Sequence, residues 1–447
     1  MQGNESDARL PTRTESHDTR PAVAQTRGAP HNCVMTSSTD DRTPRGPDIA
    51  GLQAFALEDD RLPPAAFVGR QDIIADIERA AARAAAGGDA VRGRTRLVFG
   101  APGAGKTALL HELARRWRAR AADGDASVPI PVDCEPGELT SPVAFTEAVL
   151  SALFPDSSHD VATSTTTEGG GGVPGIAGLR VSRTTSVPSL VDSVQAGRTP
   201  WAAIREAIQP ARLTRPVVLL VDETQNMPGD PNGDGRTRLL AETHDGRHGL
   251  PIMAVLGGLG DSKQVMARRG ISRFARDAVH SLPLLEDAES GEAVERFLAR
   301  HRIVGEEEAK GRWRRRIAEA CNGWPQHLHN YLCGAARALA DARGDLEHAD
   351  LDTALTAGEN WRRQYYDARL EGVSADLPAV ADIVGRISEP GAPMHRIVEW
   401  CREATETAAA GSDLHARMIH DGVLQEMPGG LVTCPIPSFR RYILARA

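Results

Sequence analysis

Five short apolar runs, each bounded by turn residues and separated by helical patterns, constrain the fold of this 447-residue chain most strongly. The runs are Leu97–Phe99, Val128–Val132, Val217–Val221, Ile252–Leu256 and Val279–Leu284. Strands that are apolar throughout are buried on both faces, and their alternation with helices indicates that they run parallel. The sequence therefore predicts an α/β fold in which helices cover both faces of a five-stranded parallel sheet.

Helical patterns flank the first run on both sides. Residues Gln71–Ala86 place Ile73, Ile77 and Ala80 on one face, and a glycine pair ends the pattern. A second helix is expected over 107–120, directly after the first strand. The first strand is thus embedded in a helix–strand–helix arrangement.

Two stretches of biased composition interrupt this pattern. Residues 1–60 are rich in Ser, Thr, Asp, Arg, Pro and Gly, with Phe55 as their only aromatic residue, and predict a disordered tail. Residues 155–200 are rich in Ser and Thr and contain the run Gly169–Gly172. We expect an insertion there, such as a glycine-rich hairpin, on the surface of an α/β domain that spans 61–284.

The strand signal disappears after Leu284, and residues 285–372 predict an all-α subdomain whose clearest helix follows Pro325. Residues 376–447 then show three helical patterns followed by two apolar pairs on either side of Pro428–Gly430. Three helices followed by a β-hairpin is the order of a winged-helix domain, a variant of the helix-turn-helix.

Charge and composition exclude several classes of protein. The net charge is −8, which argues against a wholly basic nucleic-acid clamp, and no apolar stretch is long enough for a membrane helix. The six cysteines are scattered without metal-site spacing, and the N-terminus lacks a signal pattern. We therefore expect a cytoplasmic protein with reduced thiols and no membrane partner.

The motif G-x-x-x-x-G-K-[ST] lies between the first strand and the helix after it. It comprises Gly100, Ala101, Pro102, Gly103, Ala104, Gly105, Lys106 and Thr107. In such a loop the backbone N–H groups wrap phosphates, the lysine reaches the β and γ phosphates, and the hydroxyl binds Mg²⁺. The chain has only three lysines, and one of them occupies this position.

An acidic pair ends the third strand. Asp222 and Glu223 directly follow Val217–Val221. Alone, such a pair is commonly a solvated strand exit, but downstream of a phosphate loop it predicts two roles. Asp222 would belong to the Mg²⁺ shell, and Glu223 would orient or activate the attacking water.

With these motifs in place, the sequence resembles the AAA+ ATPases, in particular the initiator-like and signalling-type (STAND-like) branches, whose domain opens with a box matched here by Phe67–Arg70. The resemblance spans about 61–345 and implies ATP and Mg²⁺ as cofactors and hydrolysis of ATP. It also implies that Val68 and Gly69 contact the nucleotide near its adenine.

Less specific sequence motifs of the family imply further roles for residues of this chain. Arg273 matches an arginine finger that a neighbouring subunit presents to bound ATP, which implies self-association. A glycine pair, Gly257 and Gly258, occupies the usual sensor-1 position, so Asp261 and Ser262 are possible substitutes. In the lid, Gln326 and His327 occupy the place of the sensor-2 arginine.

The winged-helix pattern alone does not identify a ligand. From Asp376 onward there are seven Arg and nine acidic residues, and the presumed recognition helix, about 412–421, contains one arginine, Arg417. Because phosphate contacts dominate DNA affinity, docking to a protein is at least as probable as DNA binding. The densest arginine patch elsewhere is Arg312 with 314–316.

Two functions remain open from the sequence. In the first, ATP turnover drives assembly on, or remodelling of, DNA or a DNA-acting partner. In the second, the chain is a signalling switch that turns over slowly and exchanges protein partners with nucleotide state. No motif of another enzyme class is present.

Overall fold

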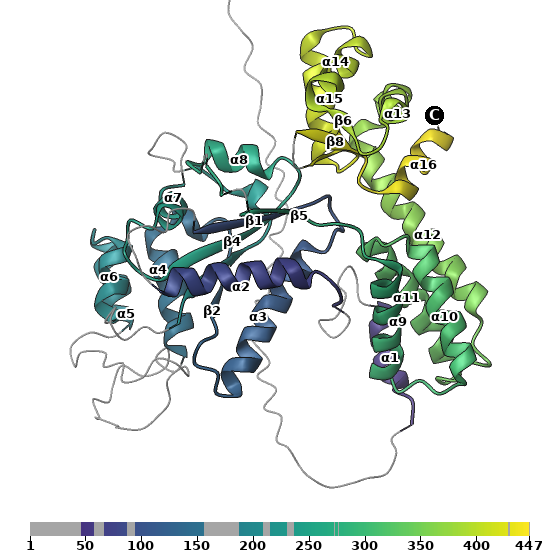
Figure 1. The fold of residues 1–447 in the computed structure, drawn as a ribbon, viewed down its shortest axis with the longest axis horizontal. Coiled ribbons are helices and arrows are strands. Elements are labelled where there is room, and N and C mark those ends of the chain that lie inside the picture. The colour runs from purple at the N-terminus through teal and green to yellow at the C-terminus, as the bar shows by residue number, and fades with distance from the viewer. Residues whose placement is uncertain are drawn as a thin grey trace, which may run out of the picture. The chain divides into compact units, whose positions relative to one another are not determined.

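The computed structural model describes residues 46–57, 67–86, 94–155, 187–208, 215–229, 237–271, 273–275, 277–427 and 430–446. The predicted five-stranded parallel sheet is confirmed (Figure 1). Its strands are β1 (Thr95–Phe99), β2 (Ile130–Cys134), β3 (Val217–Val221), β4 (Ile252–Gly258) and β5 (Val279–Ser281), in the spatial order β2-β3-β4-β1-β5. The first strand therefore lies between β4 and β5.

Alternating side chains of the strands enter two separate cores. Val98 and Val218 pack with α2 (Gln71–Ala85) and α3 (Lys106–Ala122) on one face. Leu97 and Leu219 enter the other core, with helices on the opposite face. Those helices are α4 (Pro142–Leu153), α5 (Val187–Gln195), α6 (Pro200–Ala207), α7 (Arg238–Asp245) and α8 (Ser262–Arg268). This arrangement gives the predicted three layers.

The expectation of a surface insertion over 155–200 is wrong at its C-terminal end. Residues 187–195 form α5, and both Leu190 and Trp201 of the following helix are buried in the second core. Leu190 thus belongs to a helix that packs on α4, rather than to a strand of the expected hairpin. Residues 156–186, with the glycine run, lie outside the described residues.

The lid subdomain contains α9 (Asp287–Arg300), α10 (Glu307–Cys321), α11 (Pro325–Asp341) and α12 (Leu351–Leu370). A further helix, α1 (Ile49–Leu57), packs on α11 and buries Leu52 and Phe55 in the lid core. Residues 49–57 therefore correct the expected disordered tail over 1–60. Two apolar side chains three positions apart are sufficient for this short helix to dock, whereas residues 1–45 lie outside the described residues.

The C-terminal module follows α12 through a short 3-10 segment, Glu371–Asp376. It contains the three expected helices and the hairpin in the predicted order, together with a short strand and a final helix that the sequence did not indicate. Its elements are α13 (Leu377–Arg386), β6 (Ala392–Pro393), α14 (Met394–Glu403), α15 (Ala408–His420), β7 (Gln425–Met427), β8 (Leu431–Thr433) and α16 (Pro437–Arg446). The strands pair in the order β6-β8-β7.

None of the helices in the described part of the chain combines the length and apolar character needed to cross a membrane.

Candidate functional site

The loop of residues 100–105 connects the end of β1 to the start of α3, at the carboxyl edge of the sheet. Gly103 and Gly105 have φ angles of +82° and +89°, a region that disfavours residues with a Cβ. A Cβ on Gly103 would also lie 2.7 Å from the Tyr365 hydroxyl oxygen. Glycine is thus required at these positions for the loop to wrap around the N-terminus of α3, where an anion binds favourably.

Lys106 reaches back into this loop. Its Nζ donates to the carbonyl oxygens of Gly100 (3.0 Å) and Ala101 (3.2 Å), and the side chain is buried. Burial lowers the pKa of Lys106 to about 8, while the carboxylate of Asp222 partly opposes that shift. The ammonium therefore stays mostly charged near pH 7, held inside the loop.

Arg70, the last residue of the opening box, is a site residue that sequence reasoning missed. Its Nη2 donates to the carbonyl oxygens of Ala104 (2.9 Å) and Pro283 (3.1 Å), and the residue is 7% exposed. Its Nη1 has no hydrogen-bond partner among the described residues. Burial lowers the pKa of Arg70 to about 10, so the guanidinium remains a cation beside the loop.

The lid and the C-terminal module also hold the loop. The Tyr365 hydroxyl donates to the Pro102 carbonyl (2.5 Å), and the Gln326 N–H donates to the Gly103 carbonyl (3.3 Å). From β7, the Gln425 side-chain oxygen accepts the Ala101 N–H (2.8 Å). Tyr365 and Gln425 are more than 250 residues away in sequence and belong to no recognised motif, so only the fold identifies them.

The predicted metal-binding pair is brought together. The Thr107 hydroxyl donates to a carboxylate oxygen of Asp222, and the other oxygen accepts the Glu223 N–H (2.9 Å). Hydroxyl and carboxylate oxygens suit Mg²⁺, which usually keeps few protein ligands when phosphates and water supply the rest. No group of three or more His, Cys, Asp or Glu side chains in the described ranges could hold a metal by itself, which is compatible with such a site.

Glu223 is exposed and lies next to this pair. Its φ of +49° is left-handed, and its Oε2 accepts from Asn226 Nδ2 (3.0 Å). A non-glycine residue in that region is uncommon and is often found at functional sites. The Glu223 carboxylate accepts from Asn226, whereas the Asp222 carboxylate accepts from Thr107, so the two carboxylates have different partners.

Close packing explains the glycine pair at the sensor-1 position. A Cβ on Gly257 would lie 2.7 Å from Asp222 Oδ1, and one on Gly258 would lie 2.0 Å from Ser262 Oγ. Ser262 is fully buried, and its hydroxyl has no hydrogen-bond partner among the described residues; the same is true of one Asp261 carboxylate oxygen. Ser262 therefore packs behind Gly258 instead of presenting an exposed side chain.

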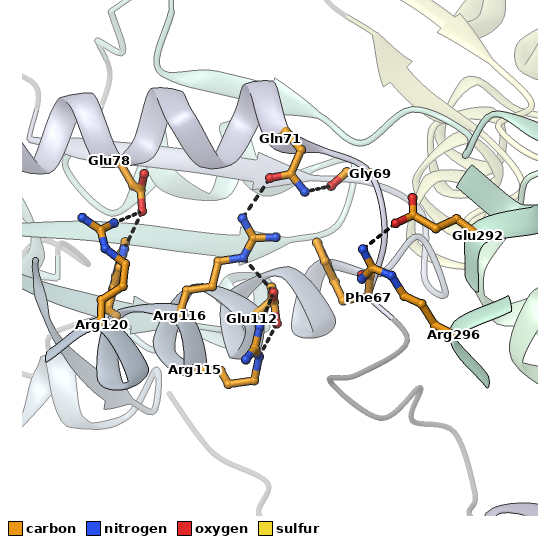
Figure 2. Close-up of polar contacts among 11 residues, drawn as sticks. Phe67, Gly69, Gln71, Glu78, Glu112, Arg115, Arg116, Arg120, Glu292 and Arg296 are labelled. Atoms are coloured by element: carbon orange, nitrogen blue, oxygen red, sulfur yellow. Dashed lines mark hydrogen bonds and ion pairs between the residues drawn. The ribbon is translucent and has the colours of Figure 1, made fainter. Parts of the chain in front are cut away.

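The opening box lies between the nucleotide domain and the lid. Val68 is buried in the lid core, and a Cβ on Gly69 would lie 2.3 Å from a carboxylate oxygen of Glu289. The Arg296 guanidinium of α9 donates to the Phe67 carbonyl (2.6 Å) (Figure 2). The box is therefore fixed on the lid side by α9.

The nucleotide-domain side of the box is fixed by a chain of polar contacts (Figure 2). Gln71 Nε2 donates to the Gly69 carbonyl (3.2 Å), and Arg116 of α3 donates to Gln71 (2.8 Å). Arg116 also pairs with Glu112 (2.7 Å), which is buried one turn earlier on the same helix. Since α3 begins at the phosphate loop, these contacts connect the box to the helix that carries that loop.

Arg273 lies away from this chain's own phosphate loop. Its side chain is exposed, and its carbonyl oxygen is 2.9 Å from His244 Nε2. The His244 carbonyl in turn accepts the N–H of Arg94, the residue before β1. Arg273 is thus near the start of β1, whereas the phosphate loop follows its end, roughly 16 Å along a five-residue strand.

The residue at the sensor-2 position is part of the lid core. His327 is fully buried, with its Nδ1 3.3 Å from the Cys321 carbonyl oxygen. Burial, together with the smaller effect of the nearby Arg362, lowers the pKa of His327 to about 3, so the ring is neutral. Of the two candidate residues, Gln326 therefore contacts the phosphate loop through its backbone, and His327 is buried away from solvent.

Comparison with known proteins bears on the same residues. The model of the AAA ATPase domain matches residues 66–243, a range that includes the opening box, the phosphate loop, Asp222 and Glu223. No curated protein matches the chain.

Among solved structures, the chain is similar to a Walker-type ATPase of Pyrococcus abyssi. The sequence identity is 14% and the TM-score 0.49, with 84% of this chain and 96% of that chain covered. It is also similar to the Aeropyrum pernix ORC2 protein in its ADP form, with 13% identity, a TM-score of 0.49, and 88% of this chain and 97% of that chain covered. Residues 66–243 thus match an AAA ATPase domain, and the phosphate loop within this range has the geometry expected of a P-loop ATPase.

Proposed function

We propose that this protein binds ATP with Mg²⁺ at the loop of residues 100–107 and hydrolyses it. The contact between Thr107 and Asp222 carries the proposal, because it joins the two predicted oxygen ligands at the edge of the loop. When bound, Mg²⁺ neutralises charge that develops on the transferring phosphate. Lys106 adds a second positive charge from inside the loop.

In this proposal Glu223 acts on the attacking water. Its carboxylate is exposed at the end of β3 and next in sequence to the Mg²⁺ ligand Asp222. A base in this place orients the water and accepts its proton. Asn226 donates to one carboxylate oxygen and so limits the rotation of the side chain. Val68, Gly69 and Arg70 would hold the nucleotide on the side of the opening box.

We also propose that the active form is an assembly in which Arg273 completes the site of a neighbouring subunit. The position of Arg273 near the start of β1 supports action on a neighbour's ATP over action on its own. A guanidinium placed against the transferring phosphate stabilises its charge in the transition state.

Arg273→Ala subunits should bind ATP as tightly as the wild type and hydrolyse it at least ~10³-fold more slowly, because an arginine finger contributes that much to turnover. Mixing them with Lys106→Ala subunits should restore part of the activity. The Arg273→Ala subunits keep an intact nucleotide site, and the Lys106→Ala subunits provide the arginine finger. Arg268→Ala, which removes a nearby exposed arginine, is the matched control and should retain turnover. Mixed oligomers that form and stay inactive would count against action between subunits.

The C-terminal module is the proposed output of the ATPase. We propose that nucleotide state governs assembly on, or remodelling of, DNA or a DNA-acting partner; the alternative is a slow signalling switch that exchanges protein partners. A specific observation favours a protein partner for the module. Arg417, the arginine of α15, is engaged inside the protein by Asp413 (2.8 Å), Asp376 (2.7 Å) and the Gly372 carbonyl (2.7 Å).

The arginine patch on α10 is also partly neutralised. Arg314 pairs with Glu295 (3.4 Å), and Arg316 pairs with Asp352 (3.1 Å). Two of the four arginines in the densest patch therefore have carboxylate neighbours. Because this pairing reduces the positive charge available to DNA phosphates, a single subunit should bind DNA only weakly.

The 447-residue chain should accordingly bind labelled duplex DNA no more tightly than about 10 μM in the absence of ATP, within the range of weak non-specific binders. Titration at two salt concentrations checks this. Sub-micromolar binding with a steep salt dependence, together with ATP hydrolysis stimulated by the duplex, would select direct action on DNA. Co-purified ADP and an ATPase rate indifferent to DNA would select the signalling switch.

A further inference from the structure

Helix α7 is hydrogen-bonded to Arg269 and to Arg273, the two ends of what we call the finger segment. At its N-terminus, the Thr237 N–H donates to the Arg269 carbonyl (3.0 Å). At its C-terminal turn, His244 Nε2 lies 2.9 Å from the Arg273 carbonyl oxygen. The two bonds are separated by the length of the helix, so α7 determines where both ends of the segment lie.

His244 is itself well fixed. It is 7% exposed, and its carbonyl accepts the Arg94 N–H (3.1 Å), which connects it to the start of β1. Its ring meets the Phe274 ring edge-on, with centroids 5.7 Å apart, and Phe274 packs against the core on that face of the sheet. One imidazole therefore contacts two consecutive residues of the segment, through a hydrogen bond to Arg273 and a ring contact to Phe274.

The protonation state of His244 agrees with this geometry. Burial lowers the pKa of His244 below its usual value, so the ring is neutral near pH 7. A carbonyl oxygen can only accept, so the tautomer that satisfies the contact carries its proton on Nε2. Nδ1 then has no hydrogen-bond partner among the described residues. The hydrogen bond that the ring makes among the described residues is therefore the one it donates to the Arg273 carbonyl.

We infer that His244 is a positioning residue for the arginine finger: it fixes the Arg273 backbone so that the exposed guanidinium meets ATP bound by the neighbouring subunit. The inference rests on the proposed function of Arg273. A long side chain that crosses an interface contributes to catalysis only where its starting point is fixed, because small displacements of a catalytic group are costly. His244 acts through Arg273 and contacts no substrate itself.

Two substitutions distinguish the effect of the His244 hydrogen bond from the effect of packing by its ring. His244→Leu keeps an apolar side chain against Phe274 and loses the donor. His244→Gln places an amide N–H at about the reach of Nε2 and retains the donor. His248→Leu is the matched control, because His248 is also buried on the same side of the sheet, but its ring stacks on Trp201 (4.3 Å).

We expect His244→Leu oligomers to turn over ATP about 10-fold more slowly, as the loss of one positioning hydrogen bond implies, with ATP affinity unchanged. His244→Gln should recover most of the rate, and His248→Leu should not reduce it. Adding Lys106→Ala subunits, which carry an intact finger segment, should raise the turnover of His244→Leu. A subunit that is merely destabilised would gain nothing from its neighbours, so this rescue distinguishes positioning from stability.

The same series separates failure of the inference from failure of the proposed function. Suppose that Arg273→Ala has reduced ATP turnover that Lys106→Ala subunits restore, while His244→Leu has wild-type turnover. The inference about His244 is then wrong, and the role of Arg273 as an arginine finger is retained. A slow His244→Leu that no mixture rescues also overturns the inference. If Arg273→Ala keeps full ATP turnover, Arg273 is not an arginine finger, and the positioning role of His244 is excluded as well.

Discussion

The variant Glu223→Gln should retain bound ATP and hydrolyse it at least ~10²-fold more slowly than the wild type, the loss typical of removing a general base or water-orienting group. Glutamine keeps the size and hydrogen-bonding ability of the side chain and removes its basicity. The neighbouring pair of Thr107 and Asp222 is unchanged by this substitution, so nucleotide binding should survive. Phosphate release and nucleotide binding, measured on the same preparation, check both halves of the prediction.

A control for Glu223→Gln is available on the adjacent strand. Glu135 follows β2, which pairs directly with β3, and its side chain is exposed at the same edge of the sheet. Glu135→Gln makes the same chemical change one strand further from the phosphate loop and should leave the rate unchanged. Equal rates in Glu223→Gln and the wild type would remove Glu223 from its assigned role.

Lys106→Ala should abolish tight nucleotide binding, with affinity for ATP lower by about 100-fold or more. The lysine is buried in the loop, where its ammonium would make a charge-assisted contact to the phosphates of bound ATP. Since the side chain is partly desolvated in the protein, its removal should not lower the free energy of unfolding greatly. Calorimetric titration with ATP and thermal unfolding measure the two quantities.

Lys310→Ala is the matched control for that variant. Lys310 is on α10 in the lid and pairs at the surface with Glu307 (2.7 Å), far from the loop in sequence. Its removal should change neither ATP affinity nor turnover. Wild-type affinity in Lys106→Ala would place the nucleotide somewhere other than the loop of residues 100–107.

The sequence was informative where one local pattern determined both structure and chemistry. The strands were predictable because they are buried on both faces, so that each run is apolar throughout, as for Val217–Val221. The proximity of Thr107 and Asp222 was predictable because the phosphate loop and the acidic strand end have fixed places on such a sheet.

Average composition was misleading where a few apolar residues lie within a polar stretch. Leu52 and Phe55 are enough to dock α1 on the lid, although the surrounding 60 residues have the composition of a disordered tail. Leu190 follows a long Ser-, Thr- and Gly-rich stretch, and its helix is short. Composition averaged over tens of residues does not resolve elements of about nine residues.

Contacts between distant elements could not be predicted at all. Tyr365 and Gln425 reach the phosphate loop from the lid and from β7, and nothing in their local sequence marks them. The burial of His327 similarly depends on how α11 packs against its neighbours. Such residues become visible only when the packing of the subdomains is known.

The most direct test of this account is the Mg²⁺ dependence of ATP hydrolysis by the 447-residue chain, compared with Lys106→Ala purified in the same way. We predict phosphate release that requires Mg²⁺, stops when the metal is chelated, and is lost in Lys106→Ala. Release that is equal in the two proteins, or that persists after chelation, would contradict the assignment of the site to Lys106, Thr107 and Asp222.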